Sequence, residues 1–476
     1  MEAENGKVES FLKDVRVASE VISRHVEKRS HIRVITHFDA DGLSAGGLIA
    51  ASLMRMGGIF SVRAERWIDA NVINETLEVK PSLTIFIDFG SGYLDLIRRL
   101  KDVEVVVLDH HQPSGESPEN VIEVNPHVNG IDGAREVSGA GVAYLTAKAL
   151  SDTNIDLAYL GVVGALADQQ DKFPDRSLGG VNGLIVNDAI ASGTLEVDTD
   201  LLLFGRETRP IHKALASTTE PFIPGISGEE DKSLALLKNL GIKPKEGDRW
   251  RALRDLSKDE KKLLFSELAS ILVAENQRDA AMSLIGTVYT LRKEEPWTSL
   301  RDCRELASLL NATGRMGRPG LGIAICAGDR GTSLKEAEEL LQNYRRAITQ
   351  YMRWVSEDPT RLQETESFFI LHGGEFINER LIGTISNIAI HSLPRSDKPL
   401  IAYSLVKGEN IVKISARGTD ETVKRGINLG EIMKRVAERF SGLGGGHDIA
   451  AGGQVPMENL EGFINALKRD MLSEVE

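Results

Sequence analysis

The sequence predicts an α/β protein with two lobes, and three observations support this prediction. Strand-like apolar runs alternate with helix-length segments in the first 110 residues, a second alternating region begins near residue 366, and one long helical pattern lies between them. Such alternation is typical of a mostly parallel sheet covered by helices. The chain has 476 residues, which is too long for one core because domains usually hold about 150 residues.

The first lobe is expected to begin with a helix and then to alternate between strands and helices. Apolar residues recur at helical spacing over residues 5–28. Strand-like runs then end near Thr36, Asp88 and Asp109, and helix-length segments such as residues 43–56 and 93–101 separate them. Ligands of parallel sheets bind beyond the carboxyl ends of the strands, so these ends are candidate site positions.

Residues 196–300 have a different character and are expected to form a helical insertion. Two segments begin with the Ser-x-x-Glu pattern of a capping box, Ser227 with Glu230 and Ser257 with Glu260. The segment contains no clear catalytic cluster. We interpret it as a structural module or a partner-binding surface, after which residues 301–332 return to the first lobe.

A connector helix and a smaller α/β lobe are expected to complete the chain. The connector, residues 333–358, has a helical pattern of about 23 residues, or about 35 Å, that stops before Pro359. The second lobe, residues 359–476, has the strand patterns FFILH, LIAYSLV and IVKISAR. Helices are expected in it near residues 380–392, 429–440 and 457–472.

Four short motifs place acidic residues and histidines where an apolar, strand-like run stops. The motifs VITHFDADG, IFIDFG, VVVLDHH and GALADQQD supply His37, Asp39, Asp41, Asp88, Asp109, His110, His111 and Asp168. Carboxylates gathered in one cleft repel one another by roughly 4 kcal/mol per close pair, so a cation is expected between them. Oxygen and imidazole ligands without thiolate suit Mn²⁺, with Mg²⁺ as the alternative, and predict a two-metal hydrolytic centre.

Plainer interpretations exist for each motif. THFDADG could be an ordinary polar turn, and DHH could be a solvated loop. A calcium loop starting at Asp39 would need ligands where Leu43 and Ala50 stand, so it is excluded. A buried acid after an apolar run needs a partner or a metal, and four such coincidences in order favour the metal centre.

The adjacent histidines of DHH are expected to have separate roles because neighbouring side chains point in different directions. We assign His110 as a metal ligand. We assign His111 to phosphate contact or to proton transfer to the leaving oxygen.

In this order the four motifs resemble those of the DHH phosphoesterase superfamily, and GGGHDIAAGG resembles the glycine-rich signature of its DHH-associated domain. The resemblance implies a DHH metal-binding domain over residues 1–195 and a substrate-binding DHH-associated domain over residues 359–476. It also implies that two metals are held by Asp39, Asp41, Asp88, Asp109, His110 and Asp168. Asp88 would bridge them and would be catalytic together with His111. Many relatives have a metal-binding histidine four residues before the first aspartate, whereas the candidate ligand His37 lies two before Asp39.

Further residues are expected to bind substrate. NATGRMGRPG resembles the Asn-Ala-x-Gly-Arg element of RecJ-type exonucleases, which implies that Arg315 contacts a phosphate. The alternative is a helix that ends at Gly314 and leaves Arg315 as a surface cation. In the second lobe, glycine amides can approach an anion, and nearby side chains can add donors. The candidates there are Ser386, Asn387, Ser415, Arg417, Gly444, Gly445, Gly446 and His447. The glycine run alone would equally suit a tight turn.

The length, the insertion and these motifs most resemble the archaeal RecJ-like nucleases that associate with the replication complex GINS. This resemblance implies a metal-dependent exonuclease that hydrolyses single-stranded DNA, or RNA, from an end in replication or repair. GINS would bind through the insertion. Three alternatives remain open: a phosphoesterase for small molecules or short oligonucleotides, a chiefly structural replication factor, and metals that regulate rather than catalyse.

Charge and composition exclude other classes of function. The net charge of -13 argues against a protein that coats nucleic acid by bulk electrostatics. No apolar run approaches the ~18 residues needed to cross a bilayer, and the charged N-terminus is unlike a signal sequence. Two cysteines, Cys303 and Cys326, are too few for a disulfide framework. We therefore expect a cytoplasmic protein without a membrane partner.

Overall fold

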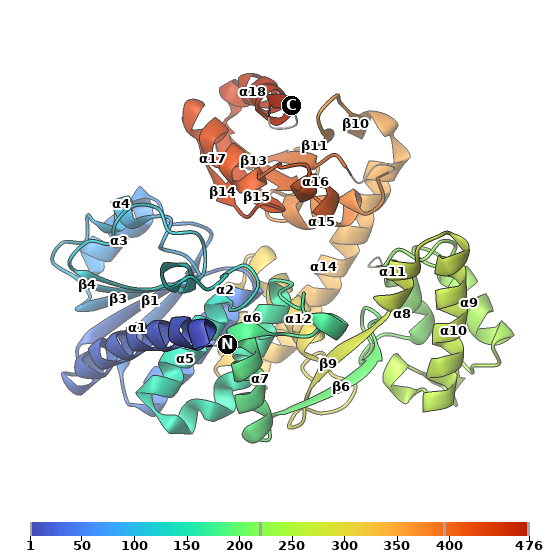
Figure 1. The fold of residues 1–476 in the computed structure, drawn as a ribbon, viewed down its shortest axis with the longest axis horizontal. Helices are drawn as coiled ribbons and strands as arrows, with labels where there is room; N and C mark the ends of the chain where they lie inside the picture. The colour runs from blue at the N-terminus through green and yellow to red at the C-terminus, as the bar shows by residue number, and fades with distance from the viewer. Residues whose placement is uncertain (1, 219–220, 394–396, 474–476) are drawn as a thin grey trace. The chain divides into compact units, whose positions relative to one another are not determined.

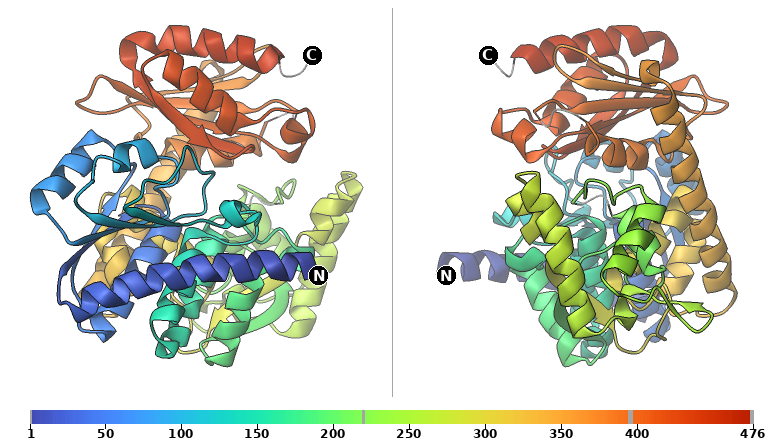
Figure 2. Two further views of the ribbon diagram at one scale, coloured as in Figure 1. Left: turned by 60° about the vertical axis from the view of Figure 1, so that its left-hand side comes forward. Right: turned by 90° about the vertical axis from the view of Figure 1, so that its right-hand side faces the viewer.

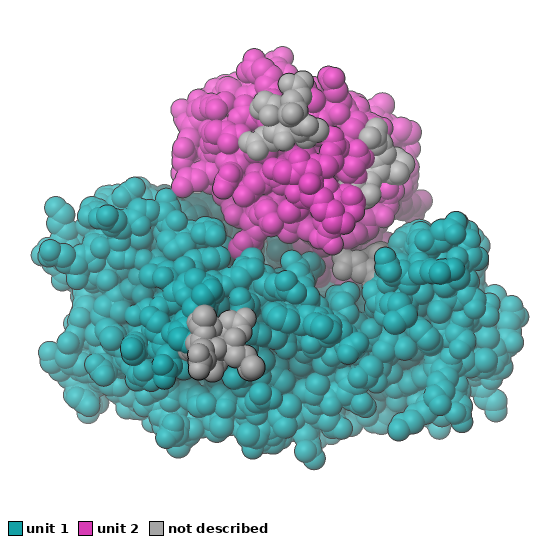
Figure 3. Space-filling view, viewed as in Figure 1, with its two compact units in different colours: residues 1–341 teal, residues 342–476 magenta. Residues whose placement is uncertain are grey.

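The structure is a computed structural model that describes residues 2–218, 221–393 and 397–473. Its internal contacts divide the chain into two compact units, residues 1–341 and residues 342–476 (Figure 3). Both units combine a sheet with helices, so the predicted α/β fold with two lobes is confirmed. Among the described residues, no helix is both long enough and apolar enough to cross a membrane.

A five-stranded parallel sheet forms the centre of the first unit. Its strand order is β2-β1-β3-β4-β5. The strands are β1 (His31–His37), β2 (Ile59–Glu65), β3 (Leu83–Ile87), β4 (Glu104–Leu108) and β5 (Val121–Val124). All five residues of β3 are buried, as expected for a parallel strand covered on both faces. The three predicted strand ends therefore meet at one edge of the sheet.

The helices of the first unit pack against this sheet and against one another (Figure 1). They are α1 (Glu2–Glu27), α2 (Ala40–Arg55), α3 (Ala70–Val79), α4 (Leu94–Ile97), α5 (Gly139–Leu150), α6 (Ala158–Ala167), α7 (Gly180–Ala191), α12 (Cys303–Arg315) and α13 (Pro319–Cys326). The predicted helix at residues 93–101 is a single turn. The apolar run before Asp168 lies in α6, so its prediction as a strand is wrong. α6 packs among α2, α5, α7 and α12, and a helix buried all round shows no polar period in its sequence.

The insertion is joined to the first unit by two antiparallel strands, β6 (Leu195–Leu201) and β9 (Ile285–Leu291). Between them lie α8 (Ile211–Ser217), α9 (Glu230–Asn239), β7 (Lys245–Glu246), β8 (Arg249–Trp250), α10 (Lys258–Ala274) and α11 (Arg278–Met282). The insertion is mainly helical and has its own apolar core (Figure 1). The two-stranded neck was not predicted; β6 is mostly exposed, whereas β9 is largely buried.

One of the two predicted capping boxes forms. The Ser257 hydroxyl accepts from the Glu260 amide at 3.2 Å, and the Glu260 carboxylate accepts from the Ser257 amide at 2.8 Å. The prediction of a capping box at Ser227 is wrong. The Ser227 hydroxyl donates to the Thr218 carbonyl at 2.5 Å instead, and α9 begins only after Glu229.

The predicted connector is one unbroken helix, α14 (Thr332–Glu357). It is followed by a 3-10 turn at Pro359–Arg361, where the proline was expected to stop the helix. The boundary between the two units falls within this helix.

The second unit contains a six-stranded mixed sheet of order β10-β11-β12-β13-β15-β14, in which only β11 and β12 are parallel. Its elements are β10 (Leu362–Glu364), β11 (Phe369–Gly374), α15 (Ile382–Ile390), β12 (Leu400–Leu405), β13 (Ile411–Arg417), α16 (Asp420–Lys424), α17 (Leu429–Arg439), β14 (Leu443–Gly446), β15 (Ala450–Pro456) and α18 (Leu460–Ser473). α17 and α18 cover one face of the sheet, and α15 packs on the other face (Figure 2). The three predicted strands and three predicted helices are present, whereas β10, β14 and β15 were not predicted.

Candidate metal centre

The acidic residues and histidines of the four motifs meet at one edge of the first sheet. Asp39 and Asp41 follow β1, Asp88 follows β3, the DHH residues follow β4, and Asp168 caps the end of α6. Ligand atoms lie within 4.8 Å of one another in three groups: Asp41, Asp88, His110 and Asp168; His37, Asp39 and Asp88; and Asp88, His110 and His111. Asp88 belongs to all three groups, which places it at the centre of the cluster.

Asp41 is fully buried and is held at the start of α5. Its Oδ1 accepts from the Ser138 hydroxyl at 2.8 Å and from the Ala140 amide at 3.0 Å, and its Oδ2 accepts from the Gly139 amide at 2.7 Å. Burial, and then the charges of Asp88 and Asp168, nevertheless raise the pKa of Asp41 well above its ordinary value. A cation beside Asp41 would offset the charges of these neighbours.

Asp88 is held in an unusual backbone conformation. Its φ of 63° lies in the left-handed region, which costs an aspartate of order 1–3 kcal/mol and is found most often at functional sites. Its backbone amide donates to the Leu108 carbonyl at 2.8 Å, which fixes this turn against the end of β4. Its Oδ1 lies 3.2 Å from His110 Nε2 but accepts no hydrogen bond from the described residues.

Two glycines keep the space beside these carboxylates open. A Cβ atom at Gly139 would lie 2.6 Å from Asp88 Oδ1, and one at Gly164 would lie 2.0 Å from Asp41 Oδ1. Any larger residue would displace the carboxylates, so the cluster requires glycine at both positions.

His110 is oriented like a metal-binding histidine. Its Nδ1 lies 2.7 Å from the Gly133 carbonyl, which can only accept a hydrogen bond, so Nδ1 carries the proton and Nε2 of the neutral ring has the lone pair. Nε2 lies 3.2 Å from both Asp88 Oδ1 and Asp168 Oδ2, and 3.8 Å from Asp41 Oδ2. Burial would lower the pKa of His110, but Asp168 and Asp88 raise it well above its ordinary value. A lone pair that faces three carboxylates requires a proton or a metal ion between them.

Asp109 belongs to none of the three ligand groups. Its Oδ1 accepts from the amides of His110 and His111 at 2.7 and 3.1 Å and lies 2.8 Å from His111 Nδ1, while Oδ2 accepts from the Ser91 amide at 2.9 Å. Burial would raise the pKa of Asp109, but the charge and hydrogen bond of His111 bring it below its ordinary value. This geometry favours a role in orienting His111 over direct metal ligation.

His37 points at the same carboxylates although it lies only two residues before Asp39. Its Nδ1 is 3.0 Å from Asp39 Oδ2 and 3.5 Å from Asp88 Oδ2. Burial lowers the pKa of His37, but Asp39 and Asp88 outweigh burial and raise it to about 10. Asp39 also caps α2 by accepting from the Gly42 amide at 3.1 Å.

Arg315 is the last residue of α12 and lies near the turn that contains Asp39. Its guanidinium is 5.8 Å from the ring centroid of Phe38, and its charge contributes, after that of His37, to a lowered pKa of Asp39. The helix ends at Arg315, one residue later than the alternative expected. Gly314 has a packing role: a Cβ atom there would lie 1.8 Å from the Phe38 carbonyl oxygen.

Sequence reasoning missed the polar residues that support the cluster from behind. Asn125 donates to the Ser91 hydroxyl and to the His111 carbonyl, each at 2.8 Å. Gln170 donates to the Gly133 carbonyl at 2.9 Å, the same oxygen that orients His110. Two short motifs could have indicated these residues: SGAG, which places Ser138 at the start of a helix, and NPH, which places Asn125 after a strand. Neither signal identified a partner far away in the sequence.

The substrate candidates of the second unit have two different environments. The Ser386 and Ser415 hydroxyls lie 2.9 Å apart and are buried, so they bond to each other. The glycine run is neither a loop nor a tight turn: it forms β14, and Gly445 stands opposite Gly452 of β15. A Cβ atom at Gly445 would meet no atom within 4 Å, so this stretch of sheet is open.

The remaining candidates lie around this open stretch. Arg417 ends β13 opposite Ala450, Asn387 is partly exposed on α15, and the backbone amide of His447 donates to the Ala450 carbonyl at 2.8 Å in the turn after β14. Lys413, which the sequence reasoning missed, has its Nζ 3.7 Å from the ideal Cβ position of Gly452. The open glycines are therefore bordered by a lysine from the neighbouring strand.

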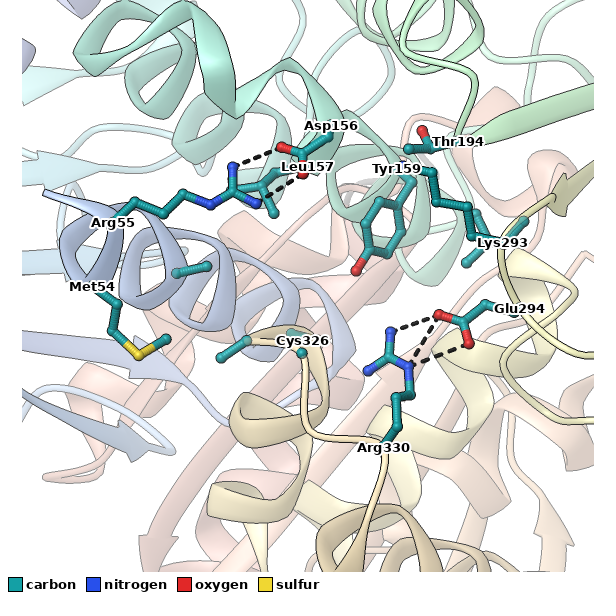
Figure 4. A pocket seen from close by; sticks show the side chains of 14 residues that line it. Met54, Arg55, Asp156, Leu157, Tyr159, Thr194, Lys293, Glu294, Cys326 and Arg330 are labelled. Atoms are coloured by element: carbon teal, nitrogen blue, oxygen red, sulfur yellow. Dashed lines mark hydrogen bonds and ion pairs between the residues drawn. The ribbon is translucent and has the colours of Figure 1, made fainter.

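A separate cavity of about 330 Å³ lies at the other ends of α2 and α6 (Figure 4). Arg55 pairs with Asp156 across one side of it, and Arg330 pairs with Glu294 across another. None of its lining residues belongs to the ligand groups of the acidic cluster. The cavity is therefore distinct from the candidate metal centre.

Three family models match the chain. They are the DHH family N-terminal domain over residues 31–164, the DHH-CID domain over residues 203–285 and the DHHA1 domain over residues 376–472. The chain is 33% identical to the uncharacterised protein MJ0831 of Methanocaldococcus jannaschii over 96% of both sequences. It is also 28% identical to the single-stranded-DNA-specific exonuclease RecJ of Thermus thermophilus over 48% of this chain, which spans 35% of that enzyme.

Solved structures share the fold at low sequence identity. Thermus thermophilus RecJ in complex with Mn²⁺ matches 97% of this chain and 55% of its own, with a TM-score of 0.58 and 18% identity. CDC45 from Entamoeba histolytica matches 96% of this chain and 99% of its own, with a TM-score of 0.66 and 12% identity. The fold thus recurs in proteins that cover nearly the whole of this chain.

Proposed function

This chain belongs to the DHH family, and from that premise we propose that it is a metal-dependent exonuclease that hydrolyses phosphodiester bonds of single-stranded nucleic acid. The observation that supports this most strongly is the geometry of His110 and Asp88. His110 Nε2 lies 3.2 Å from a carboxylate oxygen of Asp88 and 3.2 Å from one of Asp168, and this arrangement requires positive charge between the three groups. The oxygen and imidazole donors suit Mn²⁺ or Mg²⁺.

Two divalent ions would be held by the groups that share Asp88. His37 and Asp39 would hold one ion, and Asp41, His110 and Asp168 would hold the other. Bound ions would supply positive charge for the phosphate oxygens as negative charge builds on phosphorus. Asp109 would act as a positioning residue rather than as the ligand that the family resemblance implies.

His111 and Arg315 would act on the substrate beside the metals. The His111 side chain is 38% exposed, and its Nδ1 is tied to Asp109, so its ring is both accessible and oriented. We assign it to proton donation to the leaving oxygen or to phosphate contact. Arg315, next to Asp39, would contact a neighbouring phosphate.

The second unit would bind the nucleotide chain. The open glycines of β14 and β15 would let backbone and phosphate approach each other closely, and Lys413, Arg417 and His447 would add charge and donors. The buried serines would shape this sheet rather than contact substrate. The RecJ relatives are named as exonucleases specific for single-stranded DNA, which supports a single strand as the substrate.

The test is a cleavage assay with strands labelled at one end. DNA and RNA strands, each labelled at either terminus, are incubated with Mn²⁺, Mg²⁺ or chelator. We expect metal-dependent release of mononucleotides from one terminus of a single strand and no cleavage within a duplex. Hydrolysis of dinucleotides without shortening of long strands would instead identify a small-molecule phosphoesterase, and metal binding without any hydrolysis would identify a structural factor.

We also propose that the insertion binds GINS. Apolar side chains on it are exposed despite its own core, including Phe222 at 45%, Leu263 at 46% and Met282 at 74%. Such side chains could supply apolar contacts to a partner. Purified GINS should bind the full chain and should bind a Met282→Glu variant at least about threefold more weakly, whereas equal binding would contradict this surface.

A further inference from the structure

The helix α12 makes contacts with the insertion at its first turn and with the metal-binding turn at its last. It has 13 residues and spans about 19 Å. Nine of its residues are buried, among them Leu306, Leu309 and Leu310. A buried helix of this kind moves as one body, so a displacement at one end is transmitted to the other.

At the first turn of α12, a buried carboxylate binds the backbone of the insertion. Glu305 is 3% exposed, and its Oε1 accepts from the amides of Glu207 and Thr208 at 2.6 and 3.3 Å. Its Oε2 accepts from the Thr208 hydroxyl at 2.5 Å. Hydrogen bonds to a buried carboxylate are stronger than neutral ones, so this contact fixes the insertion segment to α12.

A second set of contacts joins the first turn of α12 to the insertion. Asp302 caps α12 by accepting from the amides of Arg304 and Glu305 at 2.9 and 3.1 Å. The Arg206 guanidinium lies 3.4 Å from Asp302 and 2.7 Å from Asp200 of β6, so it joins the helix cap to the insertion neck. The side chains of Arg206 and Asp302 are largely buried, which makes this a fixed link rather than a surface ion pair.

At its other end, α12 contacts the turn between β1 and α2. Asn311 Oδ1 accepts from the Ala40 amide at 3.1 Å. Ala40 lies between Asp39 and Asp41, two candidate metal ligands. Gly314 packs directly against the Phe38 carbonyl, as its missing side chain permits. The position of α12 therefore sets the position of this turn.

We propose that Glu305 is a positioning residue through which the insertion sets the geometry of the metal-binding turn, with Asn311 as the contact at the far end. A partner that binds the insertion would then act on the metal centre along α12. The inference rests on the proposed function, because it presumes that the acidic cluster binds divalent ions. It assigns Glu305 no contact with substrate or metal.

The test measures Mn²⁺ affinity by calorimetry on the full chain. Glu305→Gln keeps the shape of the side chain but places an amide nitrogen against backbone donors, so we expect Mn²⁺ to bind about three- to tenfold more weakly. Asn311→Ala should cause a similar loss. Because both act through one helix, the double variant should lose much less than the product of the two single losses.

Two control variants separate positioning from general destabilisation. Leu268→Ala removes a fully buried side chain from the insertion core and should lower the melting temperature while leaving Mn²⁺ affinity unchanged. Glu267→Gln, on the exposed face of α10, should change neither. A second readout is turnover, in which Glu305→Gln should raise the Mn²⁺ concentration for half-maximal rate with little effect at saturation.

The outcomes distinguish this inference from the proposed function. If the wild-type chain binds no divalent ion, the proposed function fails. If it binds Mn²⁺ and Glu305→Gln binds equally well, or if the two single losses simply multiply in the double variant, the role of Glu305 is overturned.

Discussion

The candidate metal centre of the first unit and the glycine-rich sheet of the second differ in what holds them in place. In the first, charged side chains from distant segments are held in place by buried hydrogen bonds, as when Asp41 accepts three bonds at the start of α5. In the second, glycines leave the backbone of the sheet uncovered: Gly445 stands opposite Gly452, and a Cβ atom at Gly445 would meet no atom within 4 Å. The first arrangement suits a reaction at a single bond. The second suits a surface that binds the backbone of a polymer.

This difference predicts that substitutions in the two regions will affect different kinetic quantities. Under the proposed function, a residue of the candidate metal centre acts on ions and reacting atoms, so its loss should lower turnover. Under the same proposal, a residue on the open sheet binds the substrate in the ground state and the transition state alike, so its loss should raise KM. The following substitutions test that division.

The largest expected effect is that of Asp88→Asn. Asp88 belongs to every ligand group, so losing its charge should lower turnover by about a thousandfold or more while strand binding and the fold persist. Turnover with Mn²⁺, strand affinity and thermal unfolding would be measured together. Asp95→Asn, an exposed aspartate at the start of α4, serves as the matched control. Unchanged turnover in the Asp88 variant would remove the bridging role.

Gly164→Ala should have the next largest effect. The new methyl group would meet Asp41 Oδ1, so we expect Mn²⁺ affinity to fall about tenfold to a hundredfold in calorimetry. Gly183→Ala, in the neighbouring helix α7, is the control: its methyl group would lie 3.7 Å from the Leu178 carbonyl oxygen, an ordinary van der Waals contact. This substitution should leave Mn²⁺ affinity unchanged and should not lower the stability of the fold. Equal affinity in both variants would show that the space beside Asp41 is not needed.

Gly445→Ala tests the open sheet. The added methyl group has room in the folded protein, so stability should persist, but it would obstruct a strand lying on the sheet. We expect KM to rise about fivefold, equivalent to ~1 kcal/mol, with kcat unchanged. Ser415→Ala should do the reverse: it should cost about 1 kcal/mol of stability through the lost bond to Ser386 and leave KM unchanged. A raised KM for Ser415→Ala would restore its predicted contact with substrate.

The smallest effect concerns pH in the metal-free protein. The pKa of His37 is raised from 6.5 to about 10, so its contribution to stability is complete below pH 6.5 and is lost as the pH rises through 10. The raised pKa values of Asp41 and Asp168 act in the same direction. In chelator, the melting temperature should therefore fall by about 2–4 °C over this range, and less in His37→Gln. Saturating Mn²⁺ should reduce the slope, because the ion replaces the protons.

The sequence predicted the parts of this molecule that depend on local pattern. Asp88 and Asp109 follow buried parallel strands, so their meeting at one sheet edge could be inferred from the alternation of strand-like and helix-length segments. Asp168 was placed correctly at the end of an apolar run, but this run is a helix and not a strand. A helix that is buried on all sides has no polar positions at regular intervals, so its sequence could not be told from that of a buried strand. The connector helix could be predicted because its pattern is long and stops at a proline.

Contacts between distant segments could not be predicted. Ser138 meets Asp41 across 97 positions in the chain, and Asn311 meets Ala40 across 271. Nothing near either residue reveals its partner. The same limit explains Ser386 and Ser415, which look available in the sequence but face each other in the folded unit.

The neck of the insertion has a consequence for how this chain can vary. Leu195 on β6 stands opposite Leu291 on β9, so the chain leaves and re-enters the first unit at adjacent points. A segment attached in this way can be lengthened, shortened or exchanged with little entropic cost to the rest, because its ends are already closed. Related proteins could thus acquire different binding partners while the acidic cluster of the first unit is inherited unchanged, provided that the replacement segment offers backbone donors to Glu305.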